Sequence, residues 1–280
     1  MITKPFSRRD FLKVLGASSG TLAGAWLLAG CAPSSESAPP PNPSPTVEAS
    51  PTTAATATPG MTASPGQTTR IIPTATPAPA TEFLPSFSEA NRIIPLPAPR
   101  LEGGISLMQA LLGRHSTRLF RPDELPMALL GDLLWAAFGV NRPQSGKRTA
   151  PSAYDVRDID IYLAAPQGLF RYQAESHNLA ALLPDDLRSF TGTQAYVAAA
   201  PLNLVYVSDY RRMTGSAAER EQWSWAHSGF IAQNVYLYCA AAGLACVVRS
   251  TIERDGLARR MDLDKNQPII LAQTLGYPAG

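Results

Sequence analysis

The chain has few cysteines and little net charge. Its 280 residues include only three cysteines, Cys31, Cys239 and Cys246, which are too few for a fold built on disulfides. We expect Cys239 and Cys246 to be small buried side chains, and a disulfide between them is the weaker alternative. The formal net charge of +2 gives no reason to expect a nucleic acid as a partner.

Several common catalytic motifs are absent from the sequence after residue 81. This part contains no G-x-S-x-G, no P-loop and no G-x-G-x-x-G, so neither a hydrolase nucleophile nor a Rossmann dinucleotide site is indicated. The three histidines of the chain lie far apart and share no ligand spacing with the cysteines, so no metal site is predicted. The apolar content of 45% is sufficient for one substantial core.

The first thirty residues have the features of an export signal. The stretch SRRDFLK (7–13) contains a twin-arginine pair followed by Phe and Leu, which is typical of the Tat export route. The apolar run that follows is short for a transmembrane span, and it ends in LAGC, which is similar to a bacterial lipobox. We therefore expect a Tat lipoprotein signal peptide over residues 1–30 and lipidation of Cys31, with an uncleaved membrane anchor as the alternative. Either interpretation places the rest of the chain outside the cytoplasmic membrane.

Residues 31–81 are predicted to be a lipid-anchored, disordered linker. Pro, Thr, Ser and Ala dominate this segment, and such a composition buries too little apolar surface to offset the entropy of ordering. The prolines favour locally extended structure, so the segment is expected to act as a stalk. Glycosylation of the linker is left open. The folded domain is expected to span residues 82–280.

Hydrophobic periodicity in the folded domain alternates between helical and strand patterns. Ser106 is expected to cap a helix, Pro126 to start a buried helix, and Gly243 to end the longest helix, which begins near Glu219. Residues 141–155 are interpreted as a loop. Strands are predicted over 159–165, 168–173, 202–210 and 268–278, with a short apolar segment over 244–250. The pattern indicates an α+β fold with helices on a central sheet.

Three polar or small-residue segments are candidates for a binding site. Arg114, Ser116 and Arg118 alternate in RHSTRLF, so an extended chain directs two guanidiniums and a hydroxyl to one side, a set suited to a phosphate and a polyol. A solvated helix end is the structural alternative. The turn PSA (151–153) can direct backbone N–H groups and a serine at a ligand, or it can be an ordinary capped turn. The segment AAGLACVVR allows a planar ligand to approach the backbone, or it can be a helix end followed by a core strand.

Taken together, these three segments resemble the nitroreductase family of FMN flavoproteins, with the SagB-like branch as the most similar. The resemblance covers residues 100–278 and implies a three-layer sandwich with a mostly antiparallel central sheet, in an interlocked homodimer. It implies that the first segment holds the FMN phosphate, ribityl chain and pyrimidine edge, and that the other two lie against the flavin ring. The cofactor-binding residues so implied are Arg114, His115, Ser116, Arg118, Pro151, Ser152, Ala153, Gly243, Leu244, Ala245, Val248 and Arg249.

The sequence departs from the family pattern after the serine turn. Where relatives have Asn and then Gln-Pro, this chain has Asp155, Arg157 and Asp158. An ionised Asp cannot donate the hydrogen bond that Asn gives to a flavin carbonyl, whereas Arg157 can donate in place of Gln. We therefore include Asp155 and Arg157 among the cofactor-binding candidates. The chain also lacks the basic residue that many relatives place on the phosphate beyond the last strand.

The resemblance further implies a ping-pong oxidoreductase in which the flavin carries hydride from a donor to a small planar acceptor. No side chain is required as a catalytic acid or base. Candidate walls for the acceptor are Tyr154, Tyr210, Trp223 and Trp225, although aromatic residues more often pack in a core. The apolar helices around Phe138 and Tyr236 would suit a buried contact between the two chains of the homodimer, and helices buried inside a single chain are the alternative with the same sequence pattern.

The predicted location restricts the electron donor. NAD(P)H is scarce outside the cytoplasm, so a redox protein or a quinol is the alternative donor, and an oxidase reaction is a further option. A SagB-like azoline dehydrogenase ranks lower, because its partner enzymes are cytoplasmic. The competing interpretation is a non-enzymatic domain that binds a small ligand on the same scaffold, and Asp155 and Asp158 are its main support.

Overall fold

A computed structural model of the protein describes residues 82–280. The predicted signal peptide (1–30), the linker (31–81) and Cys31 lie outside the described residues, so these predictions remain untested. Within the described part, no helix has both the length and the apolar character that crossing a membrane requires.

A seven-stranded sheet forms the centre of the described domain. Its strand order is β1-β6-β5-β4-β7-β9-β8, and each neighbouring pair is antiparallel. A separate hairpin pairs β2 with β3. The strands are β1 (Ile93–Pro95), β2 (Val140–Arg142), β3 (Lys147–Arg148), β4 (Ile159–Ala165), β5 (Gly168–Gln173), β6 (Asn178–Leu183), β7 (Leu202–Ser208), β8 (Ala245–Arg249) and β9 (Ile269–Gly276).

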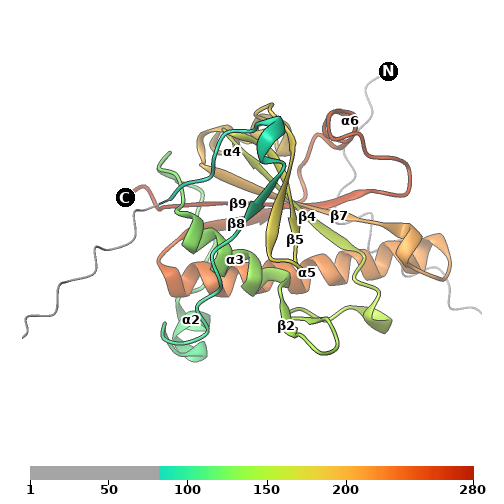
Figure 1. The fold of residues 1–280 in the computed structure, drawn as a ribbon, viewed down its shortest axis with the longest axis horizontal. Coiled ribbons are helices and arrows are strands. Elements are labelled where there is room, and N and C mark those ends of the chain that lie inside the picture. The colour runs from blue at the N-terminus through green and yellow to red at the C-terminus, as the bar shows by residue number, and fades with distance from the viewer. Residues whose placement is uncertain (1–81) are drawn as a thin grey trace, which may run out of the picture. The chain divides into compact units, whose positions relative to one another are not determined.

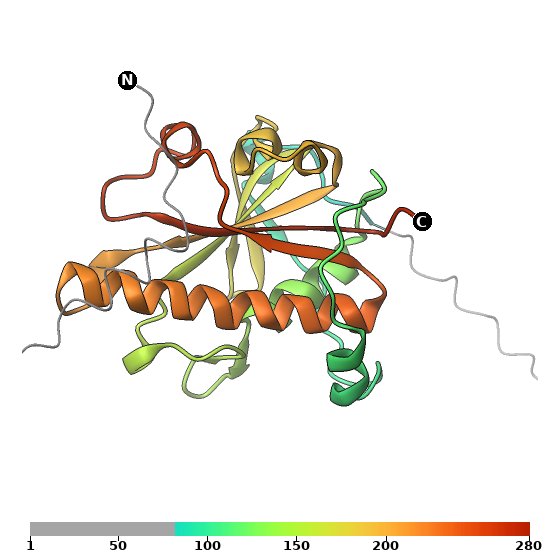
Figure 2. The same cartoon turned by 180° about the vertical axis from the view of Figure 1, so that it is seen from behind.

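Helices cover both faces of the sheet. In both views α5 runs along one side of the strands and α6 lies on the other side, which gives three layers (Figures 1 and 2). The α-helices are α2 (Leu107–Gly113), α3 (Met127–Phe138), α4 (Ala195–Ala199), α5 (Ala217–Ala242) and α6 (Arg254–Arg260). Short 3₁₀ turns are η1 (Glu89–Asn91), η2 (Ala153–Asp155), η3 (Arg188–Thr191) and η4 (Tyr210–Arg212).

Two apolar clusters hold the layers together. The larger one packs α3 and α5 against the sheet, and it includes Leu133, Leu134 and Val235, which have no exposed surface. The smaller one packs Leu257 of α6 against residues of β4 and β7 on the other face. Strand β7 is buried along its whole length, as its largely apolar sequence predicts for a strand covered on both faces.

Helix α5 is defined by its end residues. The Ser216 side chain accepts from the Glu219 N–H, and the Glu219 side chain accepts from the Ser216 N–H, which completes a capping box. At the other end Gly243 adopts φ 68° and ψ 28°, a left-handed conformation that glycine adopts without a steric penalty. The chain can therefore reverse directly from α5 into β8.

The structure confirms most of the predicted elements and the α+β class. The predicted strands over 159–165 and 168–173 match β4 and β5, and the Ser106 and Gly243 caps are present. The expected loop over 141–155 was wrong in part, because it contains the β2–β3 hairpin and η2. Strands β1 and β6 were not predicted. Cys239 and Cys246 are buried free thiols, as expected.

Removal of the Ser216 cap tests this account of α5. We expect Ser216→Ala to lower the free energy of unfolding by about 1 kcal/mol, because the Glu219 N–H loses its acceptor. Urea unfolding measures the change, with Thr214→Ala, an exposed site two residues earlier, as the control. Equal stability of the two variants would show that the capping box does not hold this end of the helix.

Candidate functional site

The segment RHSTRLF leaves α2 in an extended conformation and runs beside the ends of β8 and β9. Arg114, the residue that ends α2, has φ −66° and ψ 116°, so the helix stops there. The Thr117 N–H donates to the Cys246 carbonyl at 3.0 Å, and Phe120 forms an antiparallel bridge with Pro278. Two of the three candidate segments, RHSTRLF and the start of β8, are therefore in direct contact.

Tyr236 of α5 joins these two segments through its hydroxyl group. The hydroxyl accepts from the Val248 N–H at 2.9 Å and lies 2.8 Å from the Ser116 Oγ. When Tyr236 is the donor of the second bond, the Ser116 hydroxyl keeps its own hydrogen for a ligand. The Arg114 guanidinium lies over the Tyr236 ring, 5.4 Å from its centroid.

A groove of about 360 Å³ opens between the end of α2 and the end of α5, and we call it the α2–α5 groove. Its size lies within the range of small-molecule sites. Small residues make up much of one wall, which lets a flat ligand approach the backbone closely. The residues lining the groove are Gly113, His115, Thr117, Tyr236, Cys239, Ala240, Gly243, Leu244, Ala245, Cys246, Pro278 and Gly280.

The electrostatics at this groove depend on the arginines. Both α2 and α5 end here, and the partial negative charge of a helix C-terminus repels an anion. His115 turns its Nδ1 back to the Gly113 carbonyl, 2.7 Å away. Arg114 is half-buried and Arg118 is exposed, and with Ser116 they alternate with His115 and Thr117, which line the groove. None of Arg114, Ser116 and Arg118 lines the groove itself, whose small-residue wall fits a flat ring.

The PSA turn is attached to a different part of α5. The Ala153 N–H donates to Nε2 of His227 at 2.8 Å, and the Ser152 Oγ accepts from the Arg157 N–H at 3.1 Å. Positive φ angles of 53°, 58° and 50° follow at Tyr154, Asp155 and Arg157. Such angles are uncommon for residues other than glycine, and strained backbone of this kind is concentrated at functional sites.

A buried Asp–His pair fixes the acceptor for this turn. The His227 Nδ1 lies 2.5 Å from the Asp158 Oδ1, and both side chains are almost completely buried. The Asp158 Oδ2 also accepts from the Ser208 Oγ at 2.8 Å. The His227 Nε2 accepts a hydrogen bond from the Ala153 N–H, so it carries no hydrogen itself. The ring hydrogen is therefore on Nδ1, which donates a hydrogen bond to the Asp158 carboxylate. These contacts give Asp158 a structural role. Its presence therefore does not support the alternative in which the domain has lost its affinity for the cofactor.

Asp155 and Arg157 form an ion pair at the surface of the turn. The Arg157 Nε donates to the Asp155 Oδ1 at 3.0 Å, and its Nη2 contacts Oδ2 at 2.5 Å. The hydrogen bond from Arg157 lowers the pKa of the Asp155 carboxyl, so the group remains an ionised acceptor at neutral pH. Within this pair the Arg157 guanidinium is the hydrogen-bond donor and the Asp155 carboxylate is the acceptor.

One chain does not bring the PSA turn to the α2–α5 groove. None of residues 151–157 lines that groove, and Arg157 lines a separate cavity. The turn meets α5 at His227, whereas Ser116 meets it at Tyr236, nine residues or about 13 Å further along the helix. In Figure 1 α2 lies at the C-terminal end of α5, whereas the turn contacts α5 at His227, near the middle of the helix.

Arg249 is directed away from the groove. Successive strand residues alternate, and Cys246 and Val248 belong to the cluster on the α5 face. The Arg249 guanidinium is buried among Thr191, Asn203 and Thr274, and its Nη2 donates to the Asn203 Oδ1 at 2.8 Å. Burial lowers the pKa of Arg249 to about 10. The expectation that Arg249 helps to hold the cofactor is therefore not met, because its donors are used inside the sheet.

The four candidate wall residues lie near the PSA turn and along the first half of α5, away from the groove of the same chain. Tyr154 is 94% exposed, and the Trp223 ring stacks on His227 with 5.7 Å between centroids. Trp225 is also exposed and is two residues from Trp223, so the two indoles leave different sides of the helix. Tyr210 belongs to η4 and contacts Arg220.

The roles of Tyr236 and His227 were not predicted from the sequence. The sequence did contain a signal for the role of His227, because Ser224, His227 and Ser228 are polar residues at helical spacing on the buried side of α5. Buried polar groups require partners, and Asp158 and the Ala153 N–H are those of His227. The partner of Tyr236 is not readable from spacing, since it is the backbone of a strand that follows the helix.

The sequence and the fold were compared with those of known proteins. Residues 111–277 match the Nitroreductase family. A curated protein of Methanocaldococcus jannaschii, named as a putative nitroreductase, is 30% identical over 155 residues, which are 51% of this chain and 77% of that protein. Members of this family typically bind a flavin.

Solved structures show the same relationship. A crystal structure of a putative nitroreductase from Ralstonia eutropha JMP134 is 45% identical, with a TM-score of 0.66 over 71% of this chain and 95% of that one. Another, from Anabaena variabilis ATCC 29413, shares the fold at 19% identity, with a TM-score of 0.58 over 67% of this chain and 42% of that one. The chain belongs to the Nitroreductase family of oxidoreductases, as its three segments predicted.

Proposed function

We propose that this protein is an FMN-dependent oxidoreductase that binds its cofactor in the α2–α5 groove. The observation that carries the proposal is the contact between RHSTRLF and β8, which Tyr236 stabilises through Ser116 and Val248. This contact forms a groove of suitable size with a wall of small residues, and Arg114 and Arg118 lie in the segment that borders it without lining it. No other described cavity combines these two candidate segments.

The residues of the groove bind and orient the cofactor. Since Arg114, Ser116 and Arg118 do not line the groove, the proposal places the phosphate and the ribityl chain beyond it, where the two arginines hold the phosphate and Ser116 donates to the ribityl chain. Gly243, Leu244 and Ala245 let the flat ring lie close to the backbone. The bound flavin supplies the transfer of hydride from a donor to an acceptor. No side chain of the groove needs to act as an acid or a base in this scheme.

A second copy of the chain completes each site. The PSA turn does not reach the groove of its own chain, so a homodimer places the turn of one chain at the groove of the other. Four large apolar residues of α2, which are Leu107, Met108, Leu111 and Leu112, are exposed in the single chain, and Leu112 is 89% exposed. Exposed apolar surface of this kind is typical of an interface.

The dimer contact that we propose differs from the one expected from sequence. Phe138 and Tyr236 are buried in the core of their own chain, so they are not available to a partner. The exposed apolar residues lie instead on α2 and on the outer side of α5, at Trp223 and Phe230. These two surfaces are the proposed contact, and the aromatic candidates then lie at the interface, where they can line a site for a small planar acceptor.

Export and membrane attachment form part of the proposal, and their basis is the sequence alone. The protein is exported by the Tat route and held at the outer face of the cytoplasmic membrane by lipid on Cys31. A folded protein exported with its cofactor already bound is consistent with that route. In this location a redox protein or a quinol replaces NAD(P)H as the electron donor.

The colour of the protein tests cofactor binding. We expect the purified protein to show the visible absorption of FMN, and Arg114→Ala to weaken FMN binding about tenfold or more, because charge-assisted hydrogen bonds to the phosphate are lost. Arg92→Ala removes an exposed arginine elsewhere and is the matched control. A colourless protein that FMN cannot reconstitute would refute the proposal, and equal FMN affinity in Arg114→Ala would refute the phosphate assignment.

A double-mutant series tests whether His227 positions the PSA turn. His227→Phe removes one of the two hydrogen-bond donors of the buried Asp158 carboxylate, which is expected to cost about 3 kcal/mol of stability. The double variant His227→Phe/Asp158→Leu removes that charge, so stability recovers, but FMN binding stays weak because the Ala153 N–H has no acceptor. Unfolding and FMN titration measure the two effects. Full FMN affinity in the stable double variant would mean that the turn does not need His227.

A further inference from the structure

A second cavity lies between strands β4 and β5, away from the α2–α5 groove. Its volume is about 530 Å³, which is within the range of sites for small molecules. Successive residues of a strand point to opposite faces of a sheet, so a cavity lined by consecutive residues of two strands lies between the edges of those strands. The residues of β4 and β5 that line this cavity are Ile159, Asp160, Ile161, Arg171, Tyr172 and Gln173.

The hydrogen-bonded ladder between β4 and β5 stops before these strands end. Its last pair is Tyr162 with Arg171. At the same register, residues 159–161 would lie opposite residues 172–174, but these two stretches line the cavity and are not paired with each other. The cavity therefore takes the place of the missing part of the ladder, and we call it the β4–β5 slot.

The strand edge that faces the slot carries backbone groups without a partner in the opposite strand. The Asp158 carbonyl accepts from the Asp209 N–H at 2.8 Å, so it points toward the β7 side. In an antiparallel strand the backbone groups of successive residues point alternately to the two sides, so the N–H and carbonyl of Ile159 point into the slot. Strand edges of this kind are templates for an added strand.

The slot is bordered by aromatic rings on the α5 face of the sheet. Phe138 and Tyr172 line it there, and both belong to the larger apolar cluster. The Arg148 guanidinium lies 5.2 Å from the centre of the Phe138 ring and forms an ion pair with Glu175. The charge of Arg148 is therefore neutralised on this face, and the surface left for a ligand is mainly apolar.

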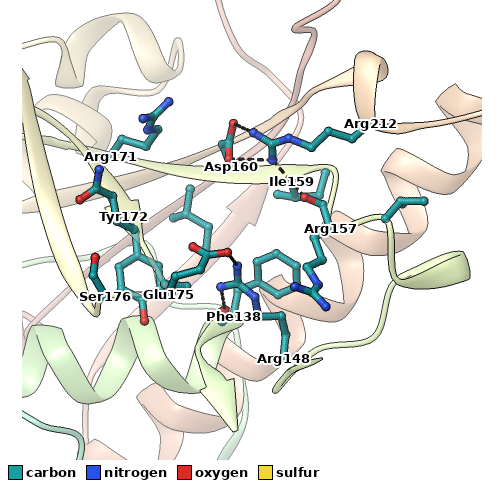
Figure 3. Close-up of a pocket in the computed structure, with 14 residues that line it drawn as sticks. Phe138, Arg148, Arg157, Ile159, Asp160, Arg171, Tyr172, Glu175, Ser176 and Arg212 are labelled. Carbon is teal, nitrogen blue, oxygen red and sulfur yellow. Dashed lines mark hydrogen bonds and ion pairs between the residues drawn. The ribbon is translucent and has the colours of Figure 1, made fainter. Parts of the chain in front are cut away.

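The opposite face of the slot is polar and carries a cation without a carboxylate partner. Arg171 lies on this face, because it is directly opposite Tyr162, whose side chain belongs to the smaller cluster beside α6. Figure 3 shows Arg171 on one side of the strands and Arg148 on the other. Arg212 is paired with Asp160 at 2.9 Å, whereas Arg171 forms no ion pair with a described residue. An acidic group on a ligand would complement the charge of Arg171.

We propose that the β4–β5 slot binds an extended peptide segment as an added strand. Three residues of a strand span about 10 Å, which is the length of the missing part of the ladder. The peptide backbone pairs with Ile159 on one edge and with Ala174 on the other. Side chains alternate along the peptide, so apolar ones face Phe138 and Tyr172 and an acidic one faces Arg171. The slot shares no residue with the α2–α5 groove, so the site does not depend on the flavin.

Calorimetric titration of the purified protein with synthetic peptides tests the proposal. The probe is a blocked pentapeptide of sequence Thr-Val-Asp-Val-Thr, in which Asp faces Arg171 when both valines face the aromatic rings. One control peptide has Lys in place of Asp, and the other carries N-methyl groups on its three central residues. We expect one site per chain for the probe at sub-millimolar concentration, binding of the Lys peptide weaker by about tenfold, and no binding of the N-methylated peptide, whose backbone cannot donate. Absence of binding of the probe at millimolar concentration, or equal binding of either control peptide, would overturn the proposal.

Hydrogen exchange and one variant locate the bound peptide. The probe should slow amide exchange in residues 156–162 and 171–176 and leave exchange in α6 unchanged, because the added strand pairs with these two edges. Arg171→Met, which breaks no described ion pair, should weaken binding of the Asp peptide about threefold or more without weakening that of the Lys peptide. Arg259→Met, at an exposed arginine of α6, is the matched control. Protection confined to α2 and α5, or unchanged binding of the Asp peptide in Arg171→Met, would place the peptide elsewhere and contradict the proposal.

Discussion

The buried side of α5 is the constraint on which both halves of the candidate site depend. One polar group on it, His227, accepts the backbone N–H of the PSA turn, and another, Tyr236, joins Ser116 to the start of β8. Each group would be costly to bury alone, so each fixes the chain segment that satisfies it. Because the two groups lie nine residues apart on a rigid helix, the two segments are held apart within one chain.

This separation is the basis of the proposed homodimer. A site assembled from two chains needs the two segments fixed at separate points of the same helix, so that two copies can exchange them. The strained backbone at Tyr154, Asp155 and Arg157 is maintained by the Ala153 and Ser152 hydrogen bonds and by the Asp155–Arg157 pair. The turn is thus formed before any partner or cofactor arrives, and less ordering is required on binding.

Much of the fold and part of the site could be predicted from the sequence. Strand-like patterns of mostly apolar residues identified β4, β5 and β7, and the Ser106 and Gly243 signals identified helix ends, because these features depend on local chemistry. The three segments identified the family. Contacts between distant segments could not be predicted, and this is why Asp158 was first interpreted as a departure from a flavin contact when it is the partner of His227. Arg249 was placed at the flavin for a related reason. A shift of one residue along a strand moves a side chain to the opposite face of the sheet, and the sequence does not show which face Arg249 occupies.

The central claim is that each flavin site is built from the groove of one chain and the turn of another. Mixed dimers test it directly: one chain carries Arg114→Ala/Arg118→Ala, and the other carries Ala153→Pro, which removes the N–H that His227 accepts. Each variant alone is expected to bind FMN weakly. A mixed dimer, isolated by a different tag on each chain, contains one intact groove facing one intact turn, so the account predicts recovery of one tightly bound FMN per dimer. Mixed dimers that bind FMN as weakly as both parents would contradict it.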